Sequence, residues 1–258
     1  MNKNNYCWFL LCLSLVILFS HENLHAQQKH YKIKTDSLGL FDQARNRSIP
    51  VTLYLPATSA TIKEQKLVIL NHGYNANQPG SSKSYSYITE KLASLGYFVA
   101  SIQHELSTDS LMPTTGIAQI VRRTNWERGV ANILFTLNEL KRLYPNLDYK
   151  HVILMGHSNG GDMIMLFAQQ YPGLADKIIS LDNRRVTIPR TSQPKIYSLR
   201  SSDQPADEGV LPTAEEQEKF RIKIIKLSNT IHNDMGNNAN KKQRKEINAY
   251  ILGFLNDR

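Results

Sequence analysis

The chain has 258 residues and a formal net charge of +9, with 31 lysines and arginines against 22 aspartates and glutamates. That length accommodates one α/β domain with a large buried core and is short for two ordinary domains. The positive charge is not gathered into a basic stretch interleaved with aromatic residues, so a nucleic-acid-binding protein is not expected. Both cysteines, Cys7 and Cys12, precede residue 27, which excludes a cysteine nucleophile or a thiolate metal site further along the chain.

Residues 1–26 have the layout of a secretory signal peptide. Lys3 precedes an uncharged apolar run, Tyr6–Phe19, and a small residue ends the segment. The run is shorter than the roughly 20 apolar residues that span a bilayer, so a membrane anchor is the weaker alternative. A lipoprotein attached through Cys12 is disfavoured because no small residues precede that cysteine. We therefore expect export to the periplasm or beyond, with residues 27–258 forming a single domain.

Beyond this leader, short β-branched runs alternate with helical patterns, which predicts a mostly parallel eight-stranded sheet with helices on both faces. Its first two strands are expected to form a hairpin. The predicted strands cover residues 31–35, 50–55, 66–70, 97–102, 151–155, 178–181, 195–199 and 222–227. The predicted helices cover residues 84–95, a stretch beginning near 124, residues 159–170, a turn after 213 and an apolar stripe formed by Ile247, Tyr250, Ile251 and Phe254.

Local signals mark several helix ends. Gly96 follows the first helix at the position where a left-handed C-cap is favoured. Thr124 with Glu127 has the pattern of a capping box, in which a threonine accepts a backbone N–H and a glutamate reaches back, and a second box begins at Thr213. The loop 104–123 is long, and it is expected to border the functional site.

The strongest chemical signal is the pentapeptide Gly156-His157-Ser158-Asn159-Gly160, which lies directly between a predicted strand and a predicted helix. A serine hydroxyl is a poor nucleophile, so a protein that uses one must expose it and set it beside a base. A sharp strand-to-helix turn presents the hydroxyl above the sheet, and glycines on either side relieve crowding. Ser158 is therefore predicted to be a nucleophile.

Such a nucleophile also requires a base and an acid that orients the base. His232 follows the last predicted strand, where this arrangement expects the base. Asp203 is the first candidate for the acid, because it follows the next-to-last strand at the usual reach. Asp207 on the same loop and Asp182 at the end of the preceding strand are the alternatives. The two aspartates that do not take the role are expected to hydrogen-bond their own loops.

Two backbone N–H groups, those of Tyr74 and Asn159, are expected to form an oxyanion hole. Tyr74 follows the third predicted strand, and Asn159 follows the nucleophile at the start of a helix. His104 and Trp126 are candidate residues of the substrate pocket. This chemistry needs no metal ion and no organic cofactor.

With Ser158, Asp203 and His232 in this order, residues 30–258 resemble the α/β-hydrolase superfamily. Within it, residues 45–56 are similar to the start of secreted bacterial serine esterases of the dienelactone-hydrolase-like and platelet-activating-factor acetylhydrolase-like kinds. Dienelactone hydrolases proper use a cysteine nucleophile, so the serine here disfavours their lactone substrate. Only a short segment separates the sixth and seventh strands, so an open site without a large cap domain is expected.

The resemblance implies a hydrolase that cleaves a small or polymer-borne carboxylic ester through an acyl-enzyme. No nucleic-acid partner is expected, and no membrane span after the leader is removed; the sequence does not specify an oligomeric state. One alternative is an exported peptidase or amidase with the same triad. Another is a binding protein that keeps the hydrolase fold without catalysis.

Overall fold

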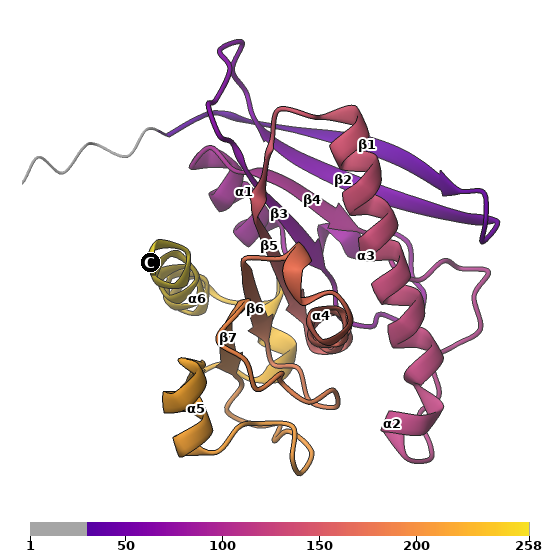
Figure 1. Ribbon diagram of the computed structural model, residues 1–258, viewed down its shortest axis with the longest axis vertical. Coiled ribbons are helices and arrows are strands. Elements are labelled where there is room, and N and C mark those ends of the chain that lie inside the picture. Colours follow the sequence, from indigo (N-terminus) through magenta and orange to yellow (C-terminus); the bar gives the residue numbers. More distant parts are fainter. Residues whose placement is uncertain (1–29, 258) are drawn as a thin grey trace, which may run out of the picture.

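An open sheet of eight strands forms the centre of the molecule, and helices cover both of its faces (Figure 1). The computed structural model describes residues 30–257. The spatial order of the strands is β1-β2-β4-β3-β5-β6-β7-β8. The strands are β1 (Ile33–Asp42), β2 (Arg47–Pro56), β3 (Lys66–Asn71), β4 (Phe98–Ile102), β5 (Asp148–His157), β6 (Lys177–Leu181), β7 (Lys195–Arg200) and β8 (Lys223–Lys226).

The pairing of the strands fixes where a site can form. β2 pairs antiparallel with β1 and with β4, and every other neighbouring pair is parallel. The carboxyl ends of β3 to β8 therefore meet at one edge of the sheet. Ligands of open α/β sheets bind in the crevice outside this edge. The segments that follow β3, β5, β6 and β8 are thus brought together although they are far apart in the sequence.

Helices from different parts of the chain cover the two faces. α1 and α6 lie on one face, and α3 and α4 lie on the other (Figure 1). The helices are α1 (Ser86–Ser94), α2 (Ala118–Val121), α3 (Arg123–Leu143), α4 (Ser158–Gln170), α5 (Ala214–Phe220) and α6 (Lys241–Asn256), with 3₁₀ turns η1 (Ser81–Lys83), η2 (Pro172–Leu174) and η3 (His232–Met235).

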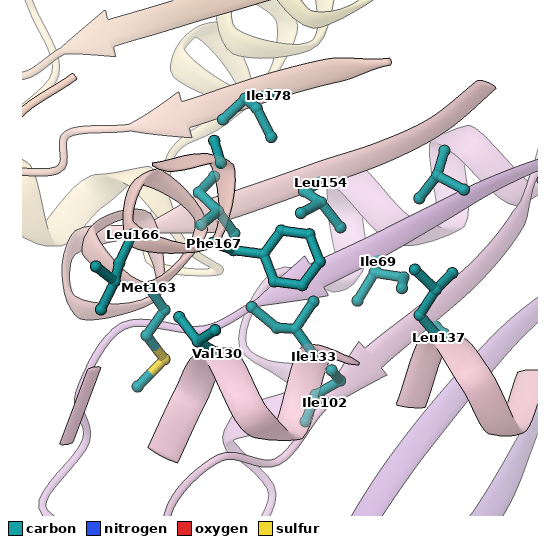
Figure 2. Packing of buried hydrophobic residues seen from close by; sticks show 14 of the residues in the cluster. Ile69, Ile102, Val130, Ile133, Leu137, Leu154, Met163, Leu166, Phe167 and Ile178 are labelled. Atoms are coloured by element: carbon teal, nitrogen blue, oxygen red, sulfur yellow. The ribbon is translucent and has the colours of Figure 1, made fainter. Parts of the chain in front are cut away.

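The face under α3 and α4 holds a large apolar core (Figure 2). Phe167 of α4 lies beside Leu154 of β5, and Ile133 and Leu137 of α3 approach Ile69 of β3. All five side chains are at most 1% exposed. Fully burying a side chain of this size stabilises the fold by about 1.5–3 kcal/mol. This packing anchors both β5 and α4, so the turn that joins them is held on both sides.

The fold class predicted from the sequence is confirmed, because the sheet has eight mostly parallel strands with helices on both faces. The first two strands form the expected hairpin. Gly96 has a φ of 97°, as expected for a left-handed C-cap, and the capping box at Thr213 is present. Residues 182–194, which join β6 to β7, contain no helix or strand, so no cap is inserted between these strands.

The capping box predicted at Thr124 and Glu127 is wrong. α3 begins at Arg123, and its N-cap, Arg122, makes no side-chain capping bond. Because α2 runs almost directly into α3, the backbone is helical before it reaches Thr124, and the Arg122 carbonyl accepts the N–H of Trp126. Glu127 pairs with Arg123 instead, with 2.7 Å between Oε1 and Nε.

Candidate active site

The chain passes from strand to helix without a connecting loop at Ser158. β5 ends at His157 and α4 begins at the next residue. Ser158 has a φ of 49°, in the left-handed region that costs an ordinary L-residue roughly 1–2 kcal/mol. Such strain persists only where the surrounding structure enforces it, and it is concentrated at functional sites. The turn presents the partly exposed Ser158 side chain at the carboxyl edge of the sheet.

Close backbone contacts explain the two glycines of this turn. A Cβ atom on Gly156 would lie 2.4 Å from the carbonyl oxygen of Gly160. A Cβ atom on Gly160 would lie 2.2 Å from the carbonyl oxygen of Asn71 at the end of β3. A side chain at either position would therefore force α4 away from the sheet and displace Ser158.

We expect Gly160→Ala to destabilise the fold by about 2–3 kcal/mol, because backbone atoms rather than a flexible side chain oppose the added methyl group. The thermal midpoint should fall by roughly 5–10 °C, measured by circular dichroism. Gly253→Ala in α6 is the matched control, since nothing lies within 4 Å of its Cβ position. Alanine there should stabilise the helix by about 0.5–1 kcal/mol. Equal midpoints for the two variants would contradict the steric explanation.

Three side chains from three separate segments form one hydrogen-bonded row. The Nε2 atom of His232 lies 2.9 Å from the Ser158 hydroxyl oxygen, and its Nδ1 atom lies 2.6 Å from Oδ2 of Asp182. His232 opens η3 after β8, and Asp182 follows β6 directly. An ionised carboxylate can only accept, so Nδ1 carries the proton and Nε2 is free to accept the serine proton.

Asp182 is held as an ionised acid by its surroundings. Its side chain is fully buried, and Oδ1 lies 2.8 Å from a guanidinium nitrogen of Arg200. Oδ1 also accepts the backbone N–H of Ser201 at 3.1 Å. Burial alone raises the pKa of Asp182, but the His232 hydrogen bond and the Arg200 charge outweigh it and leave the pKa below its usual value. The carboxylate is therefore negatively charged at neutral pH.

The expectation that Asp203 orients the imidazole is wrong in this structure. Asp203 is exposed, and its Oδ1 accepts the backbone N–H of His232 at 2.7 Å rather than a ring nitrogen. The loop after β7 carries Asp203 past the ring, whereas Asp182 leaves β6 beside it with a φ of 61°. Asp182, the last of the three candidates from the sequence, thus makes the contact with His232 that was expected of Asp203. Asp207 lies elsewhere, paired with Arg185.

The two predicted N–H donors lie around Ser158. Asn159 is the second residue of α4, and N–H groups of a first helical turn have no acceptor within their own helix. Tyr74 follows β3, and Tyr74, Asn159 and Ser158 line one common hollow. The Tyr74 hydroxyl accepts the N–H of Met112, which fixes the ring against the loop 104–123. This loop borders the site, as expected from the sequence.

A chain of hydrogen bonds that sequence reasoning missed connects the segments around Ser158. The backbone N–H of Gly73 donates to the hydroxyl of Tyr85 at 3.2 Å, and this hydroxyl lies 2.6 Å from Nδ1 of His157. The other ring nitrogen of His157 lies 3.1 Å from the carbonyl oxygen of His232. Burial lowers the pKa of His157 to about 3, so the ring is neutral and joins these segments without adding charge.

His104 and Trp126 do not line the pocket as expected. Each side chain is at most 2% exposed and lies beneath the site. Nε2 of His104 lies 2.8 Å from Oδ1 of Asn71, and Nε1 of Trp126 donates to Oδ1 of Asn159 at 2.9 Å. The sequence showed where these residues fall along the chain, but only tertiary packing shows that they face inward.

Glu105 is a buried acid that the sequence analysis did not single out. Its Oε1 accepts a hydrogen bond from the side-chain amide of Asn159 at 3.0 Å. Its Oε2 makes no hydrogen bond within the described part of the chain and lies 3.6 Å from Nε2 of His72. Burial raises the pKa of Glu105 to about 7, although the charges of Arg128 and Arg47 oppose it. Glu105 and Trp126 together hold the Asn159 side chain and so brace the first turn of α4.

The free energy of unfolding should depend on pH through Glu105. A carboxyl whose folded-state pKa is raised from 4.5 to about 7 stabilises the fold fully below pH 4.5 and progressively less up to pH 7. The loss amounts to about 3 kcal/mol, at 1.36 kcal/mol per pKa unit. We expect the free energy of unfolding of Glu105→Gln, relative to that of the wild type, to rise by roughly this amount from pH 4.5 to pH 8, measured by urea unfolding. A constant difference between the two proteins across this range would contradict the assignment.

Two hollows meet at Ser158. The larger, of about 610 Å³, lies between the segments after β3 and β8, and its rim includes Asn75, Lys83 and Asn237. The smaller, of about 230 Å³, extends from Ser158 towards the segment between β6 and β7. The linings of both are rich in polar side chains. A bound molecule could therefore place one part in each hollow with its reacting centre at the serine.

Among residues 30–257, no group of three or more histidine, cysteine, aspartate or glutamate side chains is arranged to hold a metal ion. Within the same residues, no helix has the length and apolar character needed to cross a membrane. The predicted signal peptide lies outside the described residues.

Comparisons with known proteins rest on structure alone. No model of a protein family and no curated protein sequence matches this chain. A bacterial heroin esterase is similar with a TM-score of 0.62 and 14% identity, over 87% of this chain and 84% of the other. A putative dienelactone hydrolase from Klebsiella pneumoniae subsp. pneumoniae MGH 78578 is similar with a TM-score of 0.61 and 12% identity, over 88% and 99%. The chain has the α/β-hydrolase fold.

One of the similar structures matches only over part of a longer chain. An acylaminoacyl peptidase is similar with a TM-score of 0.62 and 13% identity, over 88% of this chain but 42% of its own. The α/β-hydrolase fold predicted from the sequence is therefore confirmed, while identities this low say nothing of substrate. In an α/β-hydrolase, the strand-to-helix turn and the carboxyl edge of the sheet are where a serine nucleophile is carried.

Proposed function

We propose that the protein is a serine hydrolase that cleaves carboxylic esters, with Ser158 as nucleophile, His232 as general base and Asp182 as the acid that orients it. The observation that carries this proposal is the continuous row of hydrogen bonds from Asp182 through His232 to Ser158, at 2.6 and 2.9 Å. A base within this reach makes an otherwise weak serine hydroxyl reactive. The strained turn at Ser158 and the esterases of similar fold support the same function.

In the first step, Oγ of Ser158 attacks the ester carbonyl while Nε2 of His232 takes the hydroxyl proton. The imidazolium that forms is stabilised by the carboxylate of Asp182 on its other nitrogen. The carbonyl oxygen becomes negatively charged, and we expect the backbone N–H groups of Tyr74 and Asn159, which line the same hollow as Ser158, to donate to it. Removing one such donor in other enzymes costs about 10²–10³-fold in turnover, so this pair supplies much of the rate.

In the second half of the reaction, His232 returns its proton to the departing alcohol as the ester C–O bond breaks, leaving an acyl group on Ser158. Water then occupies the place of the alcohol and loses a proton to His232 as it attacks the acyl carbon. Breakdown of this second intermediate releases the carboxylic acid, and the serine recovers its proton. No metal ion or organic cofactor takes part in this cycle.

The surroundings of Ser158 favour short or polar acyl groups. Both hollows are open and lined largely by polar side chains, and no cap covers them. A long alkyl chain would find little apolar surface to bury, at about 0.8 kcal/mol for each buried methylene. We further propose that the enzyme acts after export, on the strength of its leader sequence.

A peptidase or amidase with the same triad is the second candidate, because an acylaminoacyl peptidase shares the fold. The chain covers less than half of that peptidase, so the likeness extends only to its hydrolase part. Amide cleavage uses the same three side chains and differs in how well the leaving amine is protonated. The two candidates are separated by their substrates rather than by the triad.

The test is a panel of p-nitrophenyl esters from acetate to palmitate together with peptide p-nitroanilides. We expect kcat/KM to be highest for acyl chains of about two to four carbons, since longer chains gain no burial. Mass spectrometry of the protein after rapid acid quenching should show the acyl group on Ser158. Faster cleavage of anilides than of esters would favour the amidase. The absence of any cleavage, in folded protein, would favour a binding protein.

A further inference from the structure

The smaller hollow beside Ser158 has a basic lining. Arg122 enters it from the junction of α2 and α3, and Arg184 and Arg185 enter from the segment between β6 and β7. Among the residues that line it, Asp162 of α4 is the one carboxylate. Three positive charges therefore lie on one side of the proposed nucleophile. Binding a neutral ester requires no positive charge there.

These arginines differ in how well they are paired. Arg185 forms an ion pair with Asp207. Arg122 donates from Nε to the carbonyl of Pro113 at 2.9 Å, which is a neutral acceptor. The guanidinium of Arg184 makes no hydrogen bond or ion pair with any residue in the described part of the chain. Arg184 is thus a charged donor that faces the hollow without an acceptor.

Asp162 serves the backbone rather than these guanidinium groups. Its Oδ1 accepts the N–H groups of Arg184, Arg185 and Val186 at 3.2, 2.9 and 2.9 Å. These bonds fix the segment that carries Arg184 to the start of α4, and so to Ser158. Asp162 and Asp207 together offset two of the three arginine charges, which leaves one positive charge in the hollow without compensation.

The surroundings of Arg184 disfavour its positive charge. Half-burial and the charges of Arg185 and Arg122 lower the pKa of Arg184, against the opposing charges of Asp182 and Asp162. Like charges kept close together at a partly buried position are unfavourable unless an anion joins them. A single carboxylate would supply both the missing charge and the missing acceptor, because guanidinium and carboxylate groups pair through two parallel hydrogen bonds.

We propose that Arg184, with Arg122, forms a carboxylate subsite beside Ser158, and that the preferred substrates are esters carrying one negative charge near the scissile bond. This rests on the proposed ester hydrolase and names its substrate class. The one uncompensated positive charge favours a monoanion over a dianion. The net charge of +9 would also draw acidic esters towards the protein.

The test compares matched pairs of esters, one acidic and one neutral, by their ratio of kcat/KM. In the first pair, methyl hydrogen succinate carries the charge on its acyl part and methyl pentanoate is its neutral counterpart. In the second pair, 4-acetoxybenzoate carries the charge on its alcohol part and 4-methylphenyl acetate is its neutral counterpart. We expect the wild type to prefer the acidic ester in at least one pair. Arg184→Gln should lower this ratio about 10–100-fold, as for the loss of a charged hydrogen bond, while Arg184→Lys should keep part of it.

Arg123→Gln is the matched control. It removes the same charge from the residue that directly follows Arg122, but the Arg123 side chain pairs with Glu127 and does not line the hollow. This variant should leave the ratio unchanged within about twofold, as for most exposed ion pairs. A ratio is insensitive to the fraction of protein that is folded. If Arg184→Gln leaves the ratio as in the wild type, or if Arg123→Gln lowers it equally, the subsite is overturned.

Binding without catalysis separates this inference from the proposed function. Methyl hydrogen succinate should bind to Ser158→Ala protein in calorimetry, and adding Arg184→Gln should weaken binding about tenfold or more. Such binding without any ester hydrolysis by the wild type would retain the subsite and refute the hydrolase. If the wild type hydrolyses esters but shows neither such binding nor a preference for acidic esters, the hydrolase is retained and the subsite is refuted.

Discussion

Replacing Ser158 with alanine is expected to lower turnover by about 10³–10⁶-fold with little change in the free energy of unfolding. In the proposed reaction the hydroxyl oxygen of Ser158 attacks the ester, and no other group in the site can take its place. What remains is the rate that the N–H donors and substrate positioning provide by themselves. Stability should be retained because the side chain is partly exposed and makes one hydrogen bond, to His232.

A fluorophosphonate probe provides the second measurement for this variant. It reacts quickly only with a serine that is activated by a base. We expect one adduct per chain, located on Ser158 by peptide mapping and absent from Ser158→Ala. His232→Ala should react far more slowly while keeping the serine. An adduct on any other serine would remove Ser158 from the proposed role.

Asp182→Asn is expected to lower turnover about 10⁴-fold, because asparagine donates a hydrogen bond to Nδ1 and so stabilises the wrong tautomer of His232. KM should change little, since Asp182 is buried behind the imidazole and does not reach substrate. The variant should also be less stable, as Arg200 loses its partner in a buried ion pair. Turnover must therefore be measured well below the thermal midpoint of the variant.

Asp203→Asn is the matched control for this prediction. The backbone N–H of His232 loses a charged acceptor at 2.7 Å, but the asparagine carbonyl can replace it. We expect turnover to fall by no more than about tenfold, as for a weakened hydrogen bond of roughly 1 kcal/mol. A greater loss for Asp203→Asn than for Asp182→Asn, in folded protein, would restore the acid predicted from the sequence.

The proposed nucleophile and base could be located from sequence because local patterns determine their positions. Ser158 lies between glycines that the strand-to-helix turn requires, and His232 follows the last strand, so chain order alone brings it to the same edge of the sheet. The acid has no such local signature. Asp182 and Asp203 both follow strands at that edge, and only the path of the backbone decides which reaches the ring.

Residues beneath the site could not be predicted for a related reason. His104 and Trp126 follow elements that end at the functional edge, which made them plausible pocket residues. Their orientation depends on partners elsewhere in the chain: Oδ1 of Asn71 for His104 and Oδ1 of Asn159 for Trp126. For the buried acid Glu105, the available signal in the sequence was its position three residues after the buried strand β4. Its burial depends on contacts that sequence spacing does not reveal.

The short segment between β6 and β7 has consequences for changing what the enzyme accepts. It carries Asp182 and Arg184 on one stretch of backbone, which Asp162 ties down through three hydrogen bonds. Laboratory evolution that remodels this stretch to admit new substrates should therefore slow the reaction as well, because any shift reaches the carboxylate that aligns His232. Asn75 and Lys83, on the opposite rim, can be varied without that penalty, so libraries built there should yield the more active variants.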